Sequence, residues 1–217
     1  MLDARLQIAL DSEALTLPET GPIAVFHPSV ELDLGALPVE RCQVVHDFKP
    51  FHDDWVARGY AVSQASETPV SMAIVCLPRS KQQARAMIAQ ACAISDGMVV
   101  IDGQKTDGAD SILREMRKRV TVQGPISKSH GKLFWIDAAA ADHFADWAAG
   151  PVLTDGGFWT APGVFSADGV DLASALLIDA LPEKLGAQVA DFGAGWGFLS
   201  AHVLTRPDIK NIHLVEA

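Results

Sequence analysis

Cysteine is scarce in this chain of 217 residues, which contains only three. Cys42, Cys76 and Cys92 are odd in number, widely spaced and without a CxxC pair. A disulfide framework requires an even set of cysteines, and a zinc ribbon requires closely spaced pairs. The sequence therefore favours neither, and we expect a reduced protein of the cytoplasm.

Long hydrophobic runs are also missing. No apolar stretch reaches the roughly 18 residues that a membrane-spanning helix needs. The N-terminal segment MLDARLQIAL lacks the long apolar region of a signal peptide. We therefore expect neither a membrane partner nor a secretory leader. The composition, 49% hydrophobic and 20% charged, is that of an ordinary globular protein and argues against disorder.

Basic residues are few, because 17 lysines and arginines face 27 aspartates and glutamates, which gives a net charge of -10. Indiscriminate nucleic-acid binding is disfavoured, since contacts with phosphates need clustered cations. Residues 114–132 are an exception: they carry six cations and one acid, or +5, which leaves -15 for the rest of the chain. This segment is either a solvated helix face with a loop or an RNA-binding surface. The candidate RNA-binding residues are Arg117, Lys118, Lys128 and Lys132.

The order of apolar runs and helical patterns predicts an α/β fold. Val70 to Leu77 is a continuous apolar run, as expected for a strand buried on both faces of a parallel sheet. Ser80 is a candidate N-cap for the following helix, which we expect Gly97 to close. The other expected strands are 23–26, 42–45, 55–62, 98–101, 120–122 and 133–136, and the other expected helices are 110–119 and 137–149.

Residues 150–163 are rich in glycine and proline and mark the best domain boundary. The sequence thus predicts a first domain at 1–150, a linker at 151–163 and the beginning of a second domain at 164–217. The second domain reads as a helix followed by a β-loop-α-β unit. Its expected elements are a helix at 171–185, a strand at 188–192, a helix at 198–204 and a strand at 211–215.

The most specific motif of the chain is Asp191-Phe192-Gly193-Ala194-Gly195-Trp196-Gly197, which follows an apolar strand and precedes a helix. Glycines at these positions allow a ligand to approach the backbone closely at the edge of a parallel sheet. Glu216 ends the next strand, where a carboxylate can accept both hydroxyl hydrogens of a ribose. The dinucleotide pattern GxGxxG fails, since residue 198 is Phe. A purely structural glycine turn remains an alternative.

The spacing Asp-x-Gly-x-Gly-x-Gly resembles motif I of the class I S-adenosylmethionine-dependent methyltransferases. Upstream, Gly163-Val164-Phe165-Ser166 with Asp171 is similar to the segment that precedes motif I in the ribosomal RNA guanine-N2 methyltransferases. Leu77-Pro78-Arg79-Ser80-Lys81 is also similar to a segment of that family. The resemblance covers most of residues 70–217, while the first 70 residues are only loosely consistent.

This resemblance implies two tandem Rossmann-like methyltransferase domains, of which the N-terminal copy is degenerate and the C-terminal copy is catalytic. It implies S-adenosylmethionine as cofactor and ribosomal RNA guanine N2 as target. The implied cofactor-binding residues are Phe165, Ser166, Asp171, Asp191, Gly193, Gly195, Gly197 and Glu216. For Asp171 the alternative is a helix cap.

The sequence departs from the family pattern in two places. Ile23 to Pro28 offers no glycine after the first strand, and no Asn precedes Pro78, so we expect neither cofactor binding nor catalysis in the first domain. The catalytic Asn-Pro-Pro-aromatic motif of the family follows the fourth strand of the second domain. No Asn-Pro occurs in the 217 residues. We therefore expect the N-terminal portion of a longer enzyme, inactive by itself, with the first domain acting as a scaffold that positions RNA.

Two other functions remain open at this point. The chain could be a non-catalytic scaffold or RNA-binding protein, or part of a methyltransferase for a small molecule or a protein, because motif I does not specify the substrate. A cluster of possible metal ligands has no common zinc spacing and is interpreted as a surface turn, so no metal site is expected. Its members are His46, Asp47, His52, Asp53 and Asp54.

Overall fold

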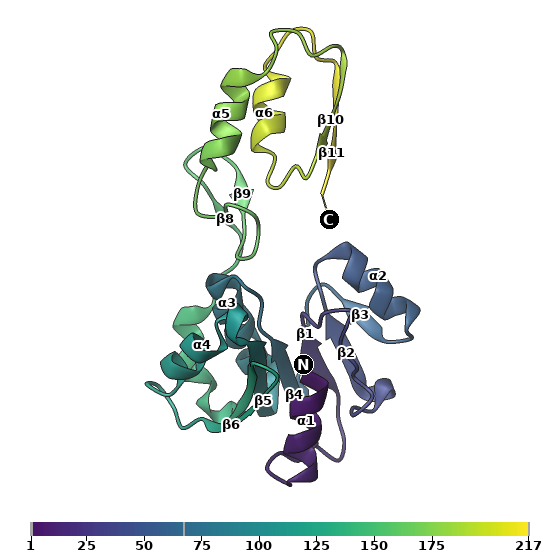
Figure 1. Ribbon diagram of the computed structural model, residues 1–217, viewed down its shortest axis with the longest axis vertical. Coiled ribbons are helices and arrows are strands. Elements are labelled where there is room, and N and C mark those ends of the chain that lie inside the picture. Colours follow the sequence, from purple (N-terminus) through teal and green to yellow (C-terminus); the bar gives the residue numbers. More distant parts are fainter. Residues whose placement is uncertain (1, 67, 217) are drawn as a thin grey trace. The chain divides into compact units, whose positions relative to one another are not determined.

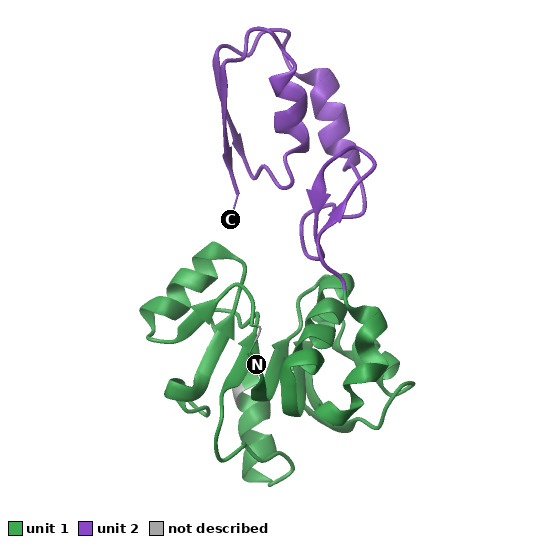
Figure 2. Ribbon diagram, turned by 180° about the vertical axis from the view of Figure 1, so that it is seen from behind, with its two compact units in different colours: residues 1–148 green, residues 149–217 purple. Residues whose placement is uncertain are grey.

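A computed structural model describes residues 2–66 and 68–216 of the chain. Figure 1 labels the elements, and Figure 2 shows the two compact units into which the chain divides, residues 1–148 and 149–217. Each unit is described by itself. No helix in the described part is long and apolar enough to cross a membrane.

Unit 1 is built around one seven-stranded sheet with the strand order β3-β2-β1-β4-β5-β7-β6. Neighbouring strands from β3 to β5 are parallel, whereas β7 is antiparallel to both β5 and β6. The sequence order reverses between β1 and β4, which makes this the topological switch point of the sheet. The strands are β1 (Ile23–Phe26), β2 (Cys42–Val45), β3 (Ala61–Ser63), β4 (Val70–Cys76), β5 (Ser95–Gln104), β6 (Gln123–Lys128) and β7 (Gly131–Asp137).

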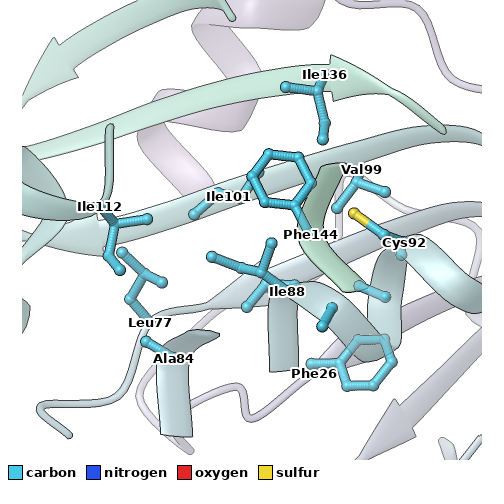
Figure 3. Close-up of a cluster of buried hydrophobic side chains, with 14 of the residues drawn as sticks. Phe26, Leu77, Ala84, Ile88, Cys92, Val99, Ile101, Ile112, Ile136 and Phe144 are labelled. Atoms are coloured by element: carbon cyan, nitrogen blue, oxygen red, sulfur yellow. The ribbon is translucent and has the colours of Figure 1, made fainter. Parts of the chain in front are cut away.

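Two hydrophobic cores cover the opposite faces of this sheet, because successive strand residues point to opposite sides. One core joins Phe26 and Ile101 with Ile88 and Phe144, as Figure 3 shows. The other core includes Leu6 and further side chains of the opposite face. The first face is covered by α3 (Lys81–Ile94), α4 (Ala109–Met116) and η3 (Ala138–Trp147), and the second by α1 (Leu2–Asp11), α2 (Lys49–Ala57) and the segment that contains η1 (Val39–Arg41).

Unit 2 contains a short hairpin, two helices and two parallel strands. Strands β10 and β11 pair in register from Gln188 with Asn211 to Phe192 with Val215. The elements are β8 (Val152–Leu153), β9 (Trp159–Thr160), α5 (Leu172–Ala180), β10 (Gln188–Phe192), α6 (Phe198–Leu204) and β11 (Asn211–Val215).

The α/β class and the Rossmann-like arrangement expected from the sequence are confirmed. The strands at 23–26 and 42–45 and the elements at 188–192, 198–204 and 211–215 have the expected bounds. Ser80 caps α3, since its Oγ accepts a hydrogen bond from the backbone N–H of Gln83 at 3.3 Å.

Three of the predictions for helices and strands in unit 1 are wrong. Residues 55–62 do not form one strand, because α2 begins just before Pro50 and runs through Trp55, and only β3 is extended. Proline is favoured in the first turn of a helix, where its missing N–H costs nothing. The strand expected at 120–122 lies instead at β6, which contains Pro125. Proline is tolerated there because β6 is an edge strand.

Gly97 does not close α3, which already ends at Ile94, but lies inside β5. The remaining differences concern helix bounds and type. The helix expected at 110–119 is α4, which begins at Ala109 and ends at Met116. The segment 137–149 forms the 3-10 helix η3, and α5 ends at Ala180, shortly before Pro182.

Candidate functional site

The glycine loop of unit 2 joins β10 to α6. Gly193, Gly195 and Gly197 all have positive φ angles, of 73°, 54° and 88°. Residues other than glycine rarely adopt positive φ angles, so the path of the backbone requires glycine at these three positions. A Cβ atom at Gly193 or Gly195 would meet nothing within 4 Å. The space beside these two positions is therefore open to a ligand.

Two carboxylates hold the loop in place. The backbone N–H of Gly195 donates a hydrogen bond to Glu216 Oε2 at 2.7 Å, and Ser200 Oγ donates one to Asp191 Oδ2 at 2.7 Å. The N–H groups of Gly193 and Ala194 donate to the Val215 carbonyl at 2.8 and 3.2 Å. The loop, the beginning of α6 and the end of β11 thus form one hydrogen-bonded corner.

A small cavity of about 60 Å³ lies at this corner. Five of the eight predicted cofactor-binding residues line it, namely Phe165, Ser166, Asp171, Gly193 and Gly195. Asp191, Gly197 and Glu216 do not line it. The cavity is small compared with the roughly 300 Å³ at which ligand pockets begin.

The segment before α5 forms the second wall of this cavity. Asp171 caps α5, because its Oδ2 accepts hydrogen bonds from the N–H and the Oγ of Ser174 at 2.8 and 3.1 Å. Ser166 has a φ angle of 54°, and its Oγ donates to the Gly169 carbonyl at 2.8 Å. Phe165 is 68% exposed beside them. The capping alternative for Asp171 is therefore the role that the structure displays.

Sequence reasoning missed several residues of this site. Trp196 and Phe198 line the cavity, and Trp196 packs against Phe158 with ring centroids 4.8 Å apart. Ser200, which holds Asp191, is among the few buried residues of unit 2. Ser200 lies on the buried side of α6 together with Val203, which is three residues further along the helix. Residues three apart share one face of a helix, so a search for polar residues on the apolar face of this helix could have found Ser200.

The basic segment of unit 1 is divided by the fold. Arg117 and Lys118 are exposed and line a shallow groove of about 890 Å³ together with Arg119 and His143. Lys128 and Lys132 lie on the β6–β7 hairpin and do not line this groove. The structure thus brings together only two of the four candidate RNA-binding residues.

Ion pairs further reduce the free positive charge of this segment. Arg119 pairs with Asp146, and Lys132 Nζ lies 2.5 Å from Asp110 Oδ1. The Lys132 ammonium holds the pKa of Asp110 below its usual value. Arg117 instead donates to a backbone carbonyl, that of Gly124 at 3.3 Å, and it forms no ion pair within the described part of the chain.

The carboxyl ends of β1 and β2 in unit 1 carry two histidines where an active domain would hold a cofactor. His27 has a φ angle of 57°, and its ring stacks on that of His46 with centroids 4.2 Å apart. Burial, together with the neighbouring His27, lowers the pKa of His46 to about 4. The surface-turn interpretation of residues 46–54 is wrong, because His46 is buried and residues 49–57 form α2.

His27, His46 and Asp47 place three possible metal-ligand atoms within 4.8 Å of one another. The Nδ1 atom of His46, however, accepts the backbone N–H of Phe48 at 3.1 Å. Its lone pair is thus engaged, and the ring is the Nε2–H tautomer. His27 Nε2 lies 3.7 Å from Asp47 Oδ1.

Comparison with known proteins bears on both units. Residues 155–217 match the model of the methyltransferase small domain. A ribosomal RNA small subunit methyltransferase C from Serratia proteamaculans is 29% identical over 157 residues, which cover 68% of this chain and 44% of that protein. The protein of the same name from Alteromonas mediterranea is 22% identical over 93% of this chain and 66% of its own length.

A solved structure is similar over almost the whole chain. It is a 16S rRNA N2 methyltransferase of T. thermophilus in complex with AdoMet and guanosine, with a TM-score of 0.69 and 23% identity over 93% of this chain and 60% of that chain. This likeness shows the fold. The chain spans about half the length of most of the curated relatives that it matches. The resemblance to the ribosomal RNA small-subunit methyltransferases that the motifs predict is thus confirmed, with the methyltransferase small domain at residues 155–217.

Proposed function

We propose that this chain is part of an S-adenosylmethionine-dependent methyltransferase that acts on guanine N2 in ribosomal RNA. The observation that carries the proposal is the loop after β10, where three glycines adopt positive φ beside the carboxylate of Glu216. The names of the relatives and the AdoMet and guanosine bound to the T. thermophilus protein support the cofactor and the substrate.

The residues of unit 2 fit this cofactor. Gly193 and Gly195 leave open space beside the backbone, and Glu216 offers two oxygens, of which Oε2 already accepts the Gly195 N–H. Ribose hydroxyls would donate to this carboxylate. Phe165 and Ser166 would form the opposite wall. Bound S-adenosylmethionine would supply the sulfonium-borne methyl group that an amine accepts.

The other predicted residues have supporting roles in this proposal. Asp191 orders the loop through Ser200, Gly197 is the N-cap residue of α6, and Asp171 fixes the segment before α5. Each acts by positioning the groups that touch the cofactor, so that orientation rather than acid or base chemistry is what this chain contributes. The proposal assigns no catalytic residue to the described part of the chain.

Unit 1 would act as a scaffold that positions RNA. Arg117 and Lys118 line the groove with the least compensated positive charge, while Lys128 and Lys132 offer a second contact on the β6–β7 hairpin. We also propose a cytoplasmic location, because the described cysteines are free and buried. Burial raises the pKa of the Cys42 thiol to about 11 and that of Cys92 to about 12, so both stay protonated.

Equilibrium binding of S-adenosylmethionine to the Gly195→Ala variant tests the cofactor site. The new Cβ enters the open space at a backbone position with a φ angle of 54°, and we expect binding to weaken at least about tenfold. Gly157→Ala is the matched control. It also has a positive φ, of 81°, and free space for a Cβ, but it does not line the cavity.

Unchanged binding by Gly195→Ala, with Gly157→Ala equally unaffected, would refute the cofactor site. If the cofactor binds at the loop but the full-length protein does not methylate ribosomal RNA, the enzyme acts on a small molecule or a protein instead. If RNA binds and the cofactor does not, the chain is a non-catalytic scaffold.

A further inference from the structure

Unit 1 contains a cavity that the proposed cofactor site does not use. It has a volume of about 290 Å³ and lies at the carboxyl ends of β1, β4 and β5. The strand order reverses between β1 and β4, and open α/β sheets bind their ligands in the crevice at such a point. The place is therefore suited to a ligand even though the glycine loop of a cofactor site is missing.

Aromatic rings form one wall of this cavity. His27 follows β1 directly, and its ring lines the cavity while stacking on His46 behind it, at 4.2 Å and an interplanar angle of 25°. Phe51 of α2 lines the cavity beside His27 and contacts His46 edge-on at 5.3 Å. Burial lowers the pKa of His27 and His46, so that both imidazoles are neutral near pH 7.

The charged groups at the base of the cavity satisfy one another. Arg5 donates to both carboxylate oxygens of Asp102 at 2.6 and 2.7 Å and to the Lys128 carbonyl at 2.8 Å. The side chains of Arg5 and Asp102 are almost fully buried, and their opposite charges compensate each other at the base of the cavity. Among the described side chains at this base, the two charges of Arg5 and Asp102 are paired with each other.

The mouth of the cavity offers polar groups of both kinds. Arg79 is exposed beside the apolar side chain of Leu77, where its planar guanidinium can stack or donate hydrogen bonds. Ser29 and Gln104 add donors and acceptors. The carboxylates of Glu31 and Asp107 also line the cavity and disfavour an anionic ligand. Neutral aromatic faces, a guanidinium plane and scattered hydrogen-bonding groups match a flat, uncharged heterocycle. Proteins hold unpaired nucleobases by stacking on Phe, His or Arg side chains in this way.

We infer that this cavity of unit 1 binds an unstacked nucleobase, presented either by an RNA strand or by a free nucleoside, with His27 as the stacking surface. The site is separate from the glycine loop of unit 2. Binding of a free nucleoside is independent of the proposed function. Binding of a base in an RNA strand rests on the proposed function.

The test uses the full chain, with guanosine and adenosine as free probes and a short single-stranded RNA carrying 4-thiouridine as the strand probe. Equilibrium dialysis measures nucleoside binding, and photo-crosslinking followed by peptide mass spectrometry locates the RNA base. We expect saturable binding of at least one probe and crosslinks to the peptides that contain His27 or Phe51. His27→Asn should weaken binding on the order of tenfold, the usual value of one stacked base.

The chosen variants keep the fold intact. Asparagine tolerates the positive φ of residue 27, so His27→Asn removes the ring without straining the backbone. His52→Asn is the matched control, because His52 lies on α2 but does not line the cavity. Arg79→Ala should weaken binding about threefold or more. Circular dichroism verifies that each variant is folded.

The outcomes distinguish a free nucleoside from an RNA strand as the source of the base, and the cavity of unit 1 from the glycine loop of unit 2 as its binding site. Nucleoside binding alone, or RNA crosslinking alone, identifies the source of the base and supports the inference if His27→Asn weakens it. No saturable binding of any probe overturns the inference, and so does binding that His27→Asn leaves unchanged. Loss of binding in Gly195→Ala but not in His27→Asn would place the base in unit 2 and overturn it as well.

Discussion

At the residue scale, His46 couples the stability of unit 1 to pH. Burial, and the neighbouring His27, lower its pKa from the ordinary 6.5 to about 4, while Asp47 opposes this shift. The unfolded chain therefore binds a proton at a pH where the folded chain does not. The stabilisation is fully present above pH 6.5 and is lost as the pH falls towards 4. We predict a loss of up to ~3 kcal/mol in the free energy of unfolding over this range.

Urea denaturation at a series of pH values measures this loss. His46→Gln keeps a hydrogen-bond acceptor for the Phe48 N–H but cannot titrate, so its unfolding free energy should change less between pH 7 and pH 4. His143→Gln, at an exposed histidine of η3, is the surface control and should follow the parent protein. Equal pH dependence of the parent and of His46→Gln would show that His46 does not carry the effect. The pKa of His27 is also lowered by burial and adds in the same direction.

At the scale of the elements, the missing side chain of Gly97 allows β5 to lie close to β4. A Cβ at this position would lie 2.1 Å from the backbone carbonyl oxygen of Ser71 in β4. Backbone cannot move aside cheaply, so β4 and β5 would have to separate. We predict that Gly97→Ala lowers the free energy of unfolding by about 2–4 kcal/mol, in the range of strongly destabilising substitutions.

The matched control for this prediction is Gly150→Ala, where a Cβ meets nothing within 4 Å. It should change the free energy of unfolding by no more than about 0.5 kcal/mol. Thermal and urea unfolding of both variants make the comparison. A cost below 1 kcal/mol for Gly97→Ala would mean that β5 accommodates the side chain by a small shift.

Elements whose local signals agree could be predicted from the sequence. One consistent interpretation existed for each of three features: the apolar run of β4, the cap of α3, and the strand-glycine-helix pattern around Gly195. Gly97 was misread and the position of β6 was missed because both depend on the neighbouring strand. A glycine at a close approach looks like a helix stop, and an edge strand that contains proline looks like a loop.

The candidate site could be predicted only where it follows a motif along the chain. Phe165, Asp171 and Gly195 were implied by the resemblance of their segments to the family motifs, and the fold brings them to one cavity. The stacking of His27 on His46 joins the ends of two parallel strands, which no local pattern reveals. The division of the basic segment between a groove and a hairpin likewise depends on the tertiary structure.

At the scale of the whole molecule, the two units differ in how much they bury. Within the described part of unit 2 only Thr160, Ser200 and Val203 are buried. Leu172 and Phe192 are 73% and 80% exposed. Unit 1 instead has two cores that enclose β4 on both faces. Since burial of apolar area provides most of the stability of a fold, the units should not be equally stable.

We therefore predict that unit 2 opens well before unit 1. In native-state hydrogen exchange, amides of β10 and β11 should exchange at least about a hundredfold faster than those of β4 and β5, because few contacts oppose local opening. The measurement is exchange followed by mass spectrometry of peptides from both units. Equal protection of β10 and β4 would contradict this account.

Binding of single-stranded RNA by this acidic molecule should depend on a small number of cations. Arg117 and Lys118 line the groove, and among the described residues neither has a carboxylate partner of the kind that Arg119 and Lys132 have. Each phosphate contact contributes about 0.7 to the slope of log K against log salt for a single strand. We predict that Arg117→Ala/Lys118→Ala weakens RNA binding and reduces this slope by about 1.4.

The paired cations provide the control for this last prediction. Lys132→Ala removes the same charge but also releases Asp110, whose carboxylate it neutralises in the folded protein. Its effect on the slope should be smaller than that of either groove cation if local charge compensation governs binding. Fluorescence anisotropy of a labelled RNA, titrated at several salt concentrations, measures both slopes. A larger effect of Lys132→Ala would move the RNA-binding surface from the groove to the β6–β7 hairpin, and it would show that the Asp110 pair opens when RNA binds.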